Sequence, residues 1–283
     1  MYQLDSYAIS HIGERRRKQE DNLYLGNSQY MDQKLIEGFS LPDNPVVTMK
    51  CTSALNKELF VAVSDGMGGH KSGETASRIV VEHLSAIEKA VHFRNINEQP
   101  EDVINQMIVL INDLILKHSQ QDPALHDMGA TLSGVFFLGG RAFTVNIGDS
   151  RVYLMRAGNL SRLTQDHTEE RIFRELGMND RIPPGKGRLM RYFGFKQEYG
   201  CLSADIIPIP TLQPGDRYLI CTDGLTDEIP DQRIWSILYN HHNPEEALRE
   251  LIRAALIGQE GDGGRDNITV ILAQIQDKIH AVT

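Results

Sequence analysis

Five aspartates lie where strands are expected to begin or end. Three follow short apolar runs and two stand just before one: Asp65, Asp149, Asp223, Asp21 and Asp266. In antiparallel sheets the end of one strand and the start of its neighbour share an edge, so the five carboxylates are predicted to meet at one rim. The alternative is that Asp65-Gly66 and Asp223-Gly224 are turn residues, as Asp-Gly often is. Neither pair is followed directly by an alternating strand, which a two-residue hairpin requires.

Such a cluster of carboxylates repels itself unless cations neutralise it. Oxygen ligands without histidine suit hard cations, so Mg²⁺ or Mn²⁺ is expected rather than zinc or copper. Two such ions about 4 Å apart would activate a water for in-line attack on phosphorus. The Gly-rich run 66–73 matches neither GxxxxGK[ST] nor GxGxxG, which argues against a nucleotide loop. Its glycines would instead let the backbone approach a metal, with the Gly66 carbonyl as a ligand.

A basic run precedes Asp21 and contains Arg15, Arg16 and Arg17. Beside a metal rim, a guanidinium offers a bidentate clamp for a phosphate dianion. A solvated charged turn is the alternative, and the three arginines compete for the role. The spacing of three residues after Gly13 and five before Asp21 favours Arg16.

The elements that would position these residues alternate between strands and helices. Short apolar runs predict strands over 3–12, 23–25, 59–63, 131–138, 141–147, 151–156, 160–163, 202–209, 217–222 and 268–275. Apolar residues at helical spacing predict helices over 76–91, 103–115, 234–239 and 245–257. Tight glycine links between the middle strands imply antiparallel neighbours. Antiparallel sheets with helices on their outer faces favour a sandwich of two sheets.

The organisation of the chain favours one domain. No linker-like composition divides residues 1–283, although the length is large for a single domain. Two segments, 26–57 and 165–200, contain prolines and are expected to be irregular.

Composition and charge exclude several classes of function. The net charge of −9, from 29 basic and 38 acidic residues, disfavours a general nucleic-acid binder. No run approaches the roughly 18 apolar residues that span a bilayer, and the first 13 residues lack the pattern of a secretory signal. Three scattered cysteines argue against a disulfide framework or a zinc site, and for a reducing cytoplasm.

Seven fragments resemble the metal-dependent PPM (type 2C) Ser/Thr protein phosphatases, bacterial branch. In family order they are GERR with QED (13–16 and 19–21), SDGMGGHKSGE (64–74), MGATL (128–132), NIGDSR (146–151), LTQDH (163–167), CTDGLTD (221–227) and GRDNITV (264–270). Each fragment alone is weakly specific, whereas seven in order over nearly the whole chain are strongly specific. The resemblance implies an α+β fold, a four-layer α-β-β-α sandwich of two antiparallel sheets flanked by helix pairs, with a dinuclear metal centre at one end.

The resemblance also implies roles for the residues of the rim. Asp65 matches the ligand that bridges two ions, Arg16 matches the arginine that binds the substrate phosphate, and Asp149 with Asp223 matches the pair that holds a weaker third ion. The segment 165–200 corresponds to a flap beside the active site, and 26–57 to an inserted loop. The implied metal ligands are Glu20, Asp21, Asp65, the Gly66 carbonyl, Asp149, Asp223 and Asp266.

The chain departs from the family pattern at a few positions. Gln19 stands where Asn is usual, and Ala130 where Thr or Ser is frequent. Met67 occupies the place of a histidine that many eukaryotic members carry as a proposed general acid. His70 lies three residues further on, where a surface or structural role is equally expected.

The expected function is hydrolysis of phosphoserine and phosphothreonine by direct attack of a metal-bridging water, with Arg16, Asp65 and Asp223 as the catalytic residues. The expected partners are phosphorylated proteins, including a Ser/Thr kinase, with no nucleic acid or membrane, and the expected state is a cytoplasmic monomer. A two-metal nuclease is disfavoured by the net charge of −9 and by the absence of interleaved aromatic and basic residues. An inactive phosphoprotein-binding module would be expected to have lost carboxylates, yet all five aspartates are present.

Overall fold

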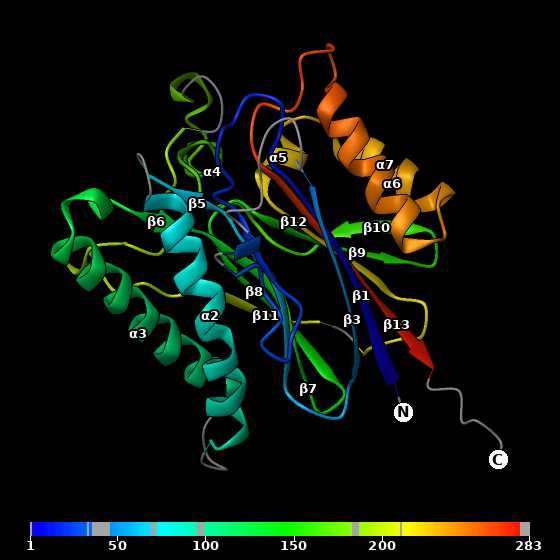
Figure 1. Cartoon of the computed structure of the whole chain (residues 1–283), viewed down its shortest axis with the longest axis horizontal. Coiled ribbons are helices and arrows are strands. Elements are labelled where there is room, and N and C mark those ends of the chain that lie inside the picture. The colour runs from blue at the N-terminus through cyan, green and yellow to red at the C-terminus, as the bar shows by residue number, and fades with distance from the viewer. Residues whose placement is uncertain are drawn as a thin grey trace.

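The computed structural model describes residues 2–32, 34–35, 46–68, 72–94, 99–182, 187–209 and 211–277. Two antiparallel sheets pack face to face at its centre (Figure 1). The six-stranded sheet has the order β10-β9-β12-β13-β1-β3, formed by Asn159–Arg162, Arg151–Arg156, Arg217–Cys221, Ile268–Asp277, Tyr2–His11 and Val46–Ala54. The five-stranded sheet has the order β11-β8-β7-β4-β2, formed by Asp205–Ile209, Arg141–Ile147, Leu132–Leu138, Leu59–Ser64 and Asn22–Tyr24.

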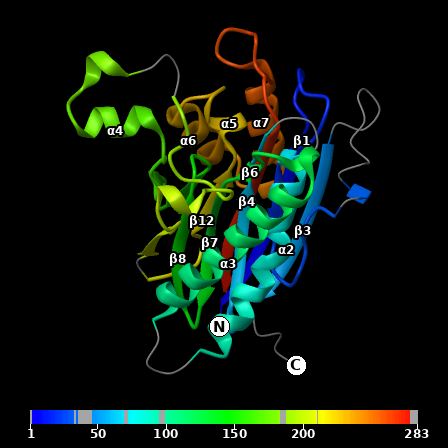
Figure 2. The same ribbon diagram turned by 90° about the vertical axis from the view of Figure 1, so that its left-hand side faces the viewer.

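Helix pairs cover the outer faces of both sheets. The five-stranded sheet is covered by α2 (Ser72–His92) and α3 (Pro100–Gln121), and the six-stranded sheet by α6 (Asp231–Asn240) and α7 (Pro244–Ile257) (Figures 1 and 2). Prolines stand in the first turns of α3 and α7, where the missing N–H costs no hydrogen bond. The predicted four-layer sandwich is therefore confirmed.

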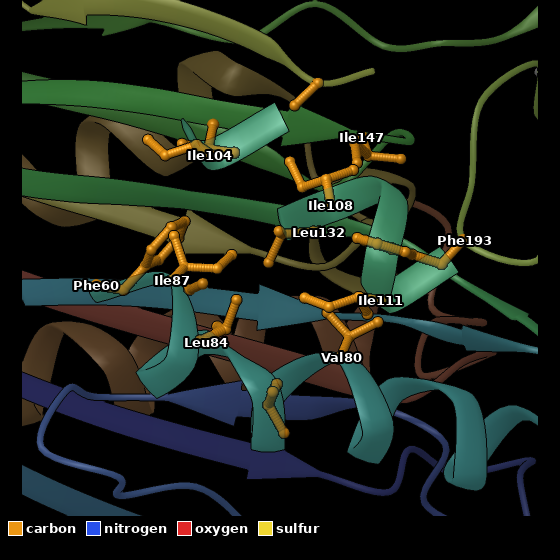
Figure 3. Close-up of a cluster of buried hydrophobic side chains, with 14 of the residues drawn as sticks. Phe60, Val80, Leu84, Ile87, Ile104, Ile108, Ile111, Leu132, Ile147 and Phe193 are labelled. Carbon is orange, nitrogen blue, oxygen red and sulfur yellow. The ribbon is translucent and has the colours of Figure 1, made fainter. Parts of the chain in front are cut away.

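The strand β4 is apolar from Leu59 to Val63, and both of its faces are buried. In β4, Val61 and Val63 point into the core between the sheets, whereas Phe60 and Ala62 point towards α2 and α3. This alternation follows from the two-residue period of a strand. Figure 3 shows the outer cluster, in which Phe60 lies among aliphatic residues of α2, α3 and the sheet.

The interpretation of 26–57 as an irregular inserted loop is wrong over its last third. Val46–Ala54 forms β3, which pairs with β1 along its length in the register from Gln3↔Ala54 to His11↔Val46. Residues 36–45 lie outside the described part of the chain. The segment 26–57 thus adds an edge strand, β3, to the six-stranded sheet.

The second segment expected to be irregular, 165–200, contains short helices. They are α4 (Glu169–Glu175) and the 3₁₀ turns η2 (Asn179–Arg181) and η3 (Gln197–Tyr199). Thr168 caps α4, because its hydroxyl accepts a hydrogen bond from Arg171 N. In the part of the chain described, no helix is long and apolar enough to cross a bilayer.

Candidate metal centre

Strand pairing brings the predicted site residues to one end of the sandwich. Asn22 lies opposite Ser64, so Asp21 and Asp65 are adjacent across the β2–β4 pair. In the other sheet, Cys221 lies opposite Val270, which places the end of β12 beside the start of β13. Asp223 begins the four-residue helix α5 (Asp223–Thr226) just after β12, and Asp266 lies just before β13.

The five aspartates interact electrostatically, and we call this group the carboxylate rim. Burial raises the pKa of Asp65 well above its usual value, and the charges of Asp21, Asp223, Asp266 and Asp149 raise it further, in that order. The predicted convergence of these five carboxylates is therefore seen in the structure. The interpretation of Asp65-Gly66 and Asp223-Gly224 as ordinary hairpin turns does not account for this convergence.

Other acids of the rim show the same electrostatic penalty. Burial raises the pKa of Asp21 to about 8, with the charges of Asp266 and Asp223 adding to the shift and hydroxyls of Thr269 and Thr222 opposing it. Burial also raises the pKa of Asp266, although the hydrogen bond from Arg16 opposes this shift. The ionised forms are costly here because like charges share a poorly solvated site.

The donor set fits hard divalent cations. The rim offers only oxygen ligands, and a bound cation would offset both the burial and the mutual repulsion of its carboxylates. Within the described ranges, no three His, Cys, Asp or Glu side chains are gathered into a group that could hold one ion. The fit of a hard divalent cation to the carboxylate rim therefore rests on the negative charge of the aspartates and on their oxygen ligands.

Arg16 lies at the rim, as the spacing predicts. Its Nη2 donates to Asp266 Oδ2 at 2.6 Å, and its Nη1 lies 3.6 Å from Glu20 Oε2. Arg15 instead donates to the Asp262 carbonyl oxygen at 3.1 Å. The Arg16 side chain is 45% exposed, so its guanidinium faces both the carboxylates and the solvent from which a phosphate would arrive.

Hydrogen bonds over long sequence separations fix the segment that carries Glu20 and Asp21. The Glu20 backbone N donates to Asn267 Oδ1 at 2.8 Å, and Thr222 Oγ1 donates to Asp21 Oδ2 at 2.8 Å. Gln19, which departs from the family pattern, is buried and accepts from the Asp21 backbone N at 2.9 Å. Its role here is to hold the turn.

Gly66 is required by close backbone packing. Its N donates to the Glu20 carbonyl at 3.2 Å. A Cβ atom at this position would lie 2.1 Å from the Gly73 carbonyl oxygen and 2.5 Å from that of Glu20, both closer than real Cβ contacts. Gly66 and Met67 form the short strand β5, which pairs with β6 (Gly129–Ala130). The absence of a side chain at Gly66 therefore lets its backbone pack against the backbone of Glu20 and Gly73.

Thr131 connects the two turns that carry Asp65 and Asp149. Its backbone N donates to the Asp65 carbonyl at 2.9 Å, and its Oγ1 accepts from Asp65 N at 3.0 Å. The same hydroxyl lies 2.9 Å from Ser150 Oγ. Sequence reasoning missed Thr131, Thr222 and Asn267 as supporting residues, although each lies inside or beside a fragment of the family pattern.

Two further departures from that pattern are placed differently. Ala130 exchanges backbone hydrogen bonds with Phe193, at 3.1 and 2.7 Å, so it joins the end of the 165–200 segment to the small β5–β6 sheet. Met67 is half-buried and lies on β5. His70 lies outside the described residues.

Comparisons with known proteins agree with this site. A profile of the family described as "Protein phosphatase 2C" matches residues 50–256. The chain is 34% identical over 223 residues to the serine/threonine protein phosphatase PstP of Mycobacterium tuberculosis, covering 77% of this chain and 40% of PstP. It is 33% identical over 222 residues to a serine/threonine phosphatase, stp, of Listeria monocytogenes, covering 76% of this chain and 84% of the relative.

Solved structures share the fold. The catalytic domain of PstP, crystallised with two manganese ions, superposes with a TM-score of 0.72 at 28% identity, covering 98% of this chain and 100% of that domain. The chain thus spans about 40% of the length of full PstP and matches its catalytic domain. The chain belongs to the protein phosphatase 2C family.

Proposed function

We propose that this protein is a metal-dependent phosphatase that removes phosphate from phosphoserine and phosphothreonine in proteins. The observation that carries the proposal is the carboxylate rim, where five aspartates and Arg16 come together from both sheets. The names of the relatives and the manganese ions in the PstP catalytic domain support it. A rim of carboxylates beside one arginine suits a phosphate dianion held by cations.

Divalent ions, Mg²⁺ or Mn²⁺, would be held mainly by Asp65, the Gly66 carbonyl, Asp223 and Asp266. Glu20 and Asp21 would contribute directly or through water. We propose a weaker third ion at Asp149. When bound, such ions supply charge neutralisation at the phosphoryl oxygens and lower the pKa of an attacking water.

The chain's own residues position the phosphate. Arg16 would bind it through the guanidinium that now contacts Asp266, because charge-assisted pairs with phosphate are strong and directional. Met67 stands at the position where some members of the family are proposed to use a general acid, and its thioether has no proton to donate. The leaving oxygen would therefore take its proton from water. No covalent phospho-enzyme is required.

The proposed partners are phosphorylated proteins, among them a Ser/Thr kinase, and the proposed state is a monomer. We also propose a cytoplasmic location. In support, Cys51, Cys201 and Cys221 are all free thiols, as a reducing compartment favours.

One assay tests the function. The metal-stripped protein is given EDTA, Mg²⁺ or Mn²⁺ and is assayed on a phosphothreonine peptide and on p-nitrophenyl phosphate, with Asp65→Asn as the control for contaminating phosphatase. We expect turnover only with added metal, and much less in the variant. Full activity in EDTA would contradict the metal-dependent mechanism. Cleavage of plasmid DNA would favour the nuclease, and peptide binding without turnover would favour the inactive module.

A further inference from the structure

A pocket of about 510 Å³ lies between the β9–β10 hairpin and α4. Its lining is unusually basic for a chain with a net charge of −9. Four arginines contribute to it, against three acids: Arg151, Arg162, Arg171 and Arg174, with Asp166, Glu170 and Glu175. We call it the arginine pocket.

Two of the four arginines are committed to the fold. Arg151 holds Asp166 in a bidentate pair, with Nε 3.1 Å from Oδ1 and Nη2 2.7 Å from Oδ2. Arg162 donates to the same carboxylate through a short hydrogen bond. One acid thus serves two guanidinium groups, and Arg151 is only 14% exposed. Arg151 Nη1 also lies 3.8 Å from Asp231 Oδ1, so this half of the pocket is preformed and its two guanidinium groups face two carboxylates.

The other two arginines are held loosely. Arg171 pairs with Glu175 at 2.7 Å and Arg174 with Glu170 at 2.8 Å, each one turn apart on α4. Their side chains are 31% and 64% exposed. Exposed pairs of this kind contribute only about 0.3–0.5 kcal/mol, so an arriving anion can displace the glutamate at little cost.

The arginine pocket is close to the carboxylate rim. Arg151 lies two residues after Asp149, so their Cα atoms are at most about 8 Å apart. Its partner Asp166 precedes His167, whose backbone N donates to the Gly148 carbonyl at 2.9 Å. Figures 1 and 2 show α4 at the same end of the molecule as α5. An extended peptide advances about 3.3 Å per residue, so a side chain two to five residues from the rim would reach the pocket.

We propose that the arginine pocket binds an acidic group of the substrate, a carboxylate or a second phosphate, located two to five residues from the phosphorylated residue. This rests on the phosphatase function proposed above. Guanidinium groups recognise both anions through paired N–H donors. The pocket thereby selects acidic phosphoproteins, which the net charge of −9 would otherwise repel.

The test compares phosphothreonine peptides that differ at a single residue. That residue is placed two, three, four or five positions before or after the phosphothreonine, and at each position it is Glu, Gln or phosphoserine. The value of kcat/KM is measured for the wild type and for the double variant Arg171→Gln/Arg174→Gln. Arg249→Gln is the matched control, because Arg249 is 59% exposed and pairs with Glu245 at 2.8 Å, one turn away on α7. The single variant Arg174→Gln provides a second test in case the double variant does not fold, because the Arg174 side chain is 64% exposed.

At one or more positions we expect the wild type to favour the acidic peptide over its Gln counterpart by roughly 3- to 10-fold. The preference should fall towards one in the double variant, fall partly in Arg174→Gln, and persist in Arg249→Gln. A preference for phosphoserine alone identifies a phosphate subsite, and equal preference identifies a general anion subsite.

Equal turnover of Glu, phosphoserine and Gln peptides by the wild type would contradict the proposal that the arginine pocket binds an acidic group, and it would leave the proposed phosphatase function unaffected. An acidic preference that survives in the double variant would contradict the same proposal. Absence of hydrolysis of every peptide and of p-nitrophenyl phosphate would instead reject the proposed function, and the pocket with it.

Discussion

The carboxylate rim and the arginine pocket lie at the same end of the molecule but are built differently. The rim draws its aspartates from strand ends of both sheets, and buried hydrogen bonds such as that from Thr222 to Asp21 hold them. The loose half of the pocket depends on α4, a seven-residue helix with no buried residue. Its ion pairs are exposed and local.

The difference indicates how each region can act. Groups on rigid strands keep their positions even though their charges repel, because the surrounding packing determines those positions. Groups on a short exposed helix can exchange partners at small cost. The first arrangement suits chemistry that needs fixed geometry, and the second suits selection among substrates.

Removing a rim carboxylate should give the largest effect. Asp65→Asn is expected to lower kcat at least about 1,000-fold, because ligand loss costs several kcal/mol of transition-state stabilisation. Thermal melting in EDTA should not fall, since the change relieves a buried and repelled charge. Asp180→Asn, an exposed aspartate of the 165–200 segment, is the control. Near-normal turnover of Asp65→Asn at saturating Mn²⁺ would mean that Asp65 is not a ligand.

The two regions should also differ in tolerance of a single methyl group. Gly66→Ala is expected to cost about 3 kcal/mol or more, because the new Cβ meets two backbone carbonyls that cannot move away cheaply. Gly177→Ala, just after α4, meets nothing within 4 Å and bears only the strain of φ +69°, about 1 kcal/mol. Urea unfolding of both variants measures the contrast. Equal losses would show that the rim is no more tightly packed than the segment after α4.

Arg16→Ala should lower kcat/KM for a phosphopeptide roughly 10- to 100-fold, mainly through KM, because charged hydrogen bonds contribute about 1.5–3 kcal/mol. Arg15→Ala is the matched control, since Arg15 contacts the Asp262 carbonyl and not the rim. Steady-state kinetics on one peptide distinguish the two. If Arg15→Ala had the larger effect, the phosphate-binding role would belong to Arg15 and not to Arg16.

Most of the fold and the membership of the rim could be predicted, because short apolar runs and the aspartates at their ends are local signals. The strand β3 was missed because its inward positions include Cys51 and Ser53 in place of large aliphatic residues. Helix α5 is four residues long, too short to show a helical period.

The supports of the rim escaped prediction for a different reason. Thr222 and Asp21 lie 201 residues apart, and Asn267 and Glu20 lie 247 apart. Only the completed sheet pairing brings such residues together. The arginine pocket also depends on tertiary structure, since Arg151 and α4 meet through Asp166.

The smallest expected effect concerns His167, which joins the turn before Asp149 to the 165–200 segment. Its Nδ1 accepts from Gly148 N at 3.1 Å, and its Nε2 donates to Asp205 Oδ2, 2.9 Å away, while Arg191 holds the other oxygen of Asp205 at 2.6 Å. Burial lowers the pKa of His167, partly opposed by Asp205 and reinforced by Arg191.

The sign of the pH effect follows from that shift. As pH falls below about 6.5, the unfolded chain takes up the proton before the folded one, so the wild type loses stability. His167→Asn lacks this group, and its free energy of unfolding should fall less between pH 7.5 and 5.5. The slopes should differ by no more than about 1.4 kcal/mol per pH unit. The rim carboxylates titrate in both proteins and cancel in the comparison. His242→Asn, at an exposed histidine, should follow the wild type. If the free energy of unfolding changed with pH equally in the wild type and in His167→Asn, then His167 would not be a buried neutral group that joins the turn before Asp149 to the 165–200 segment.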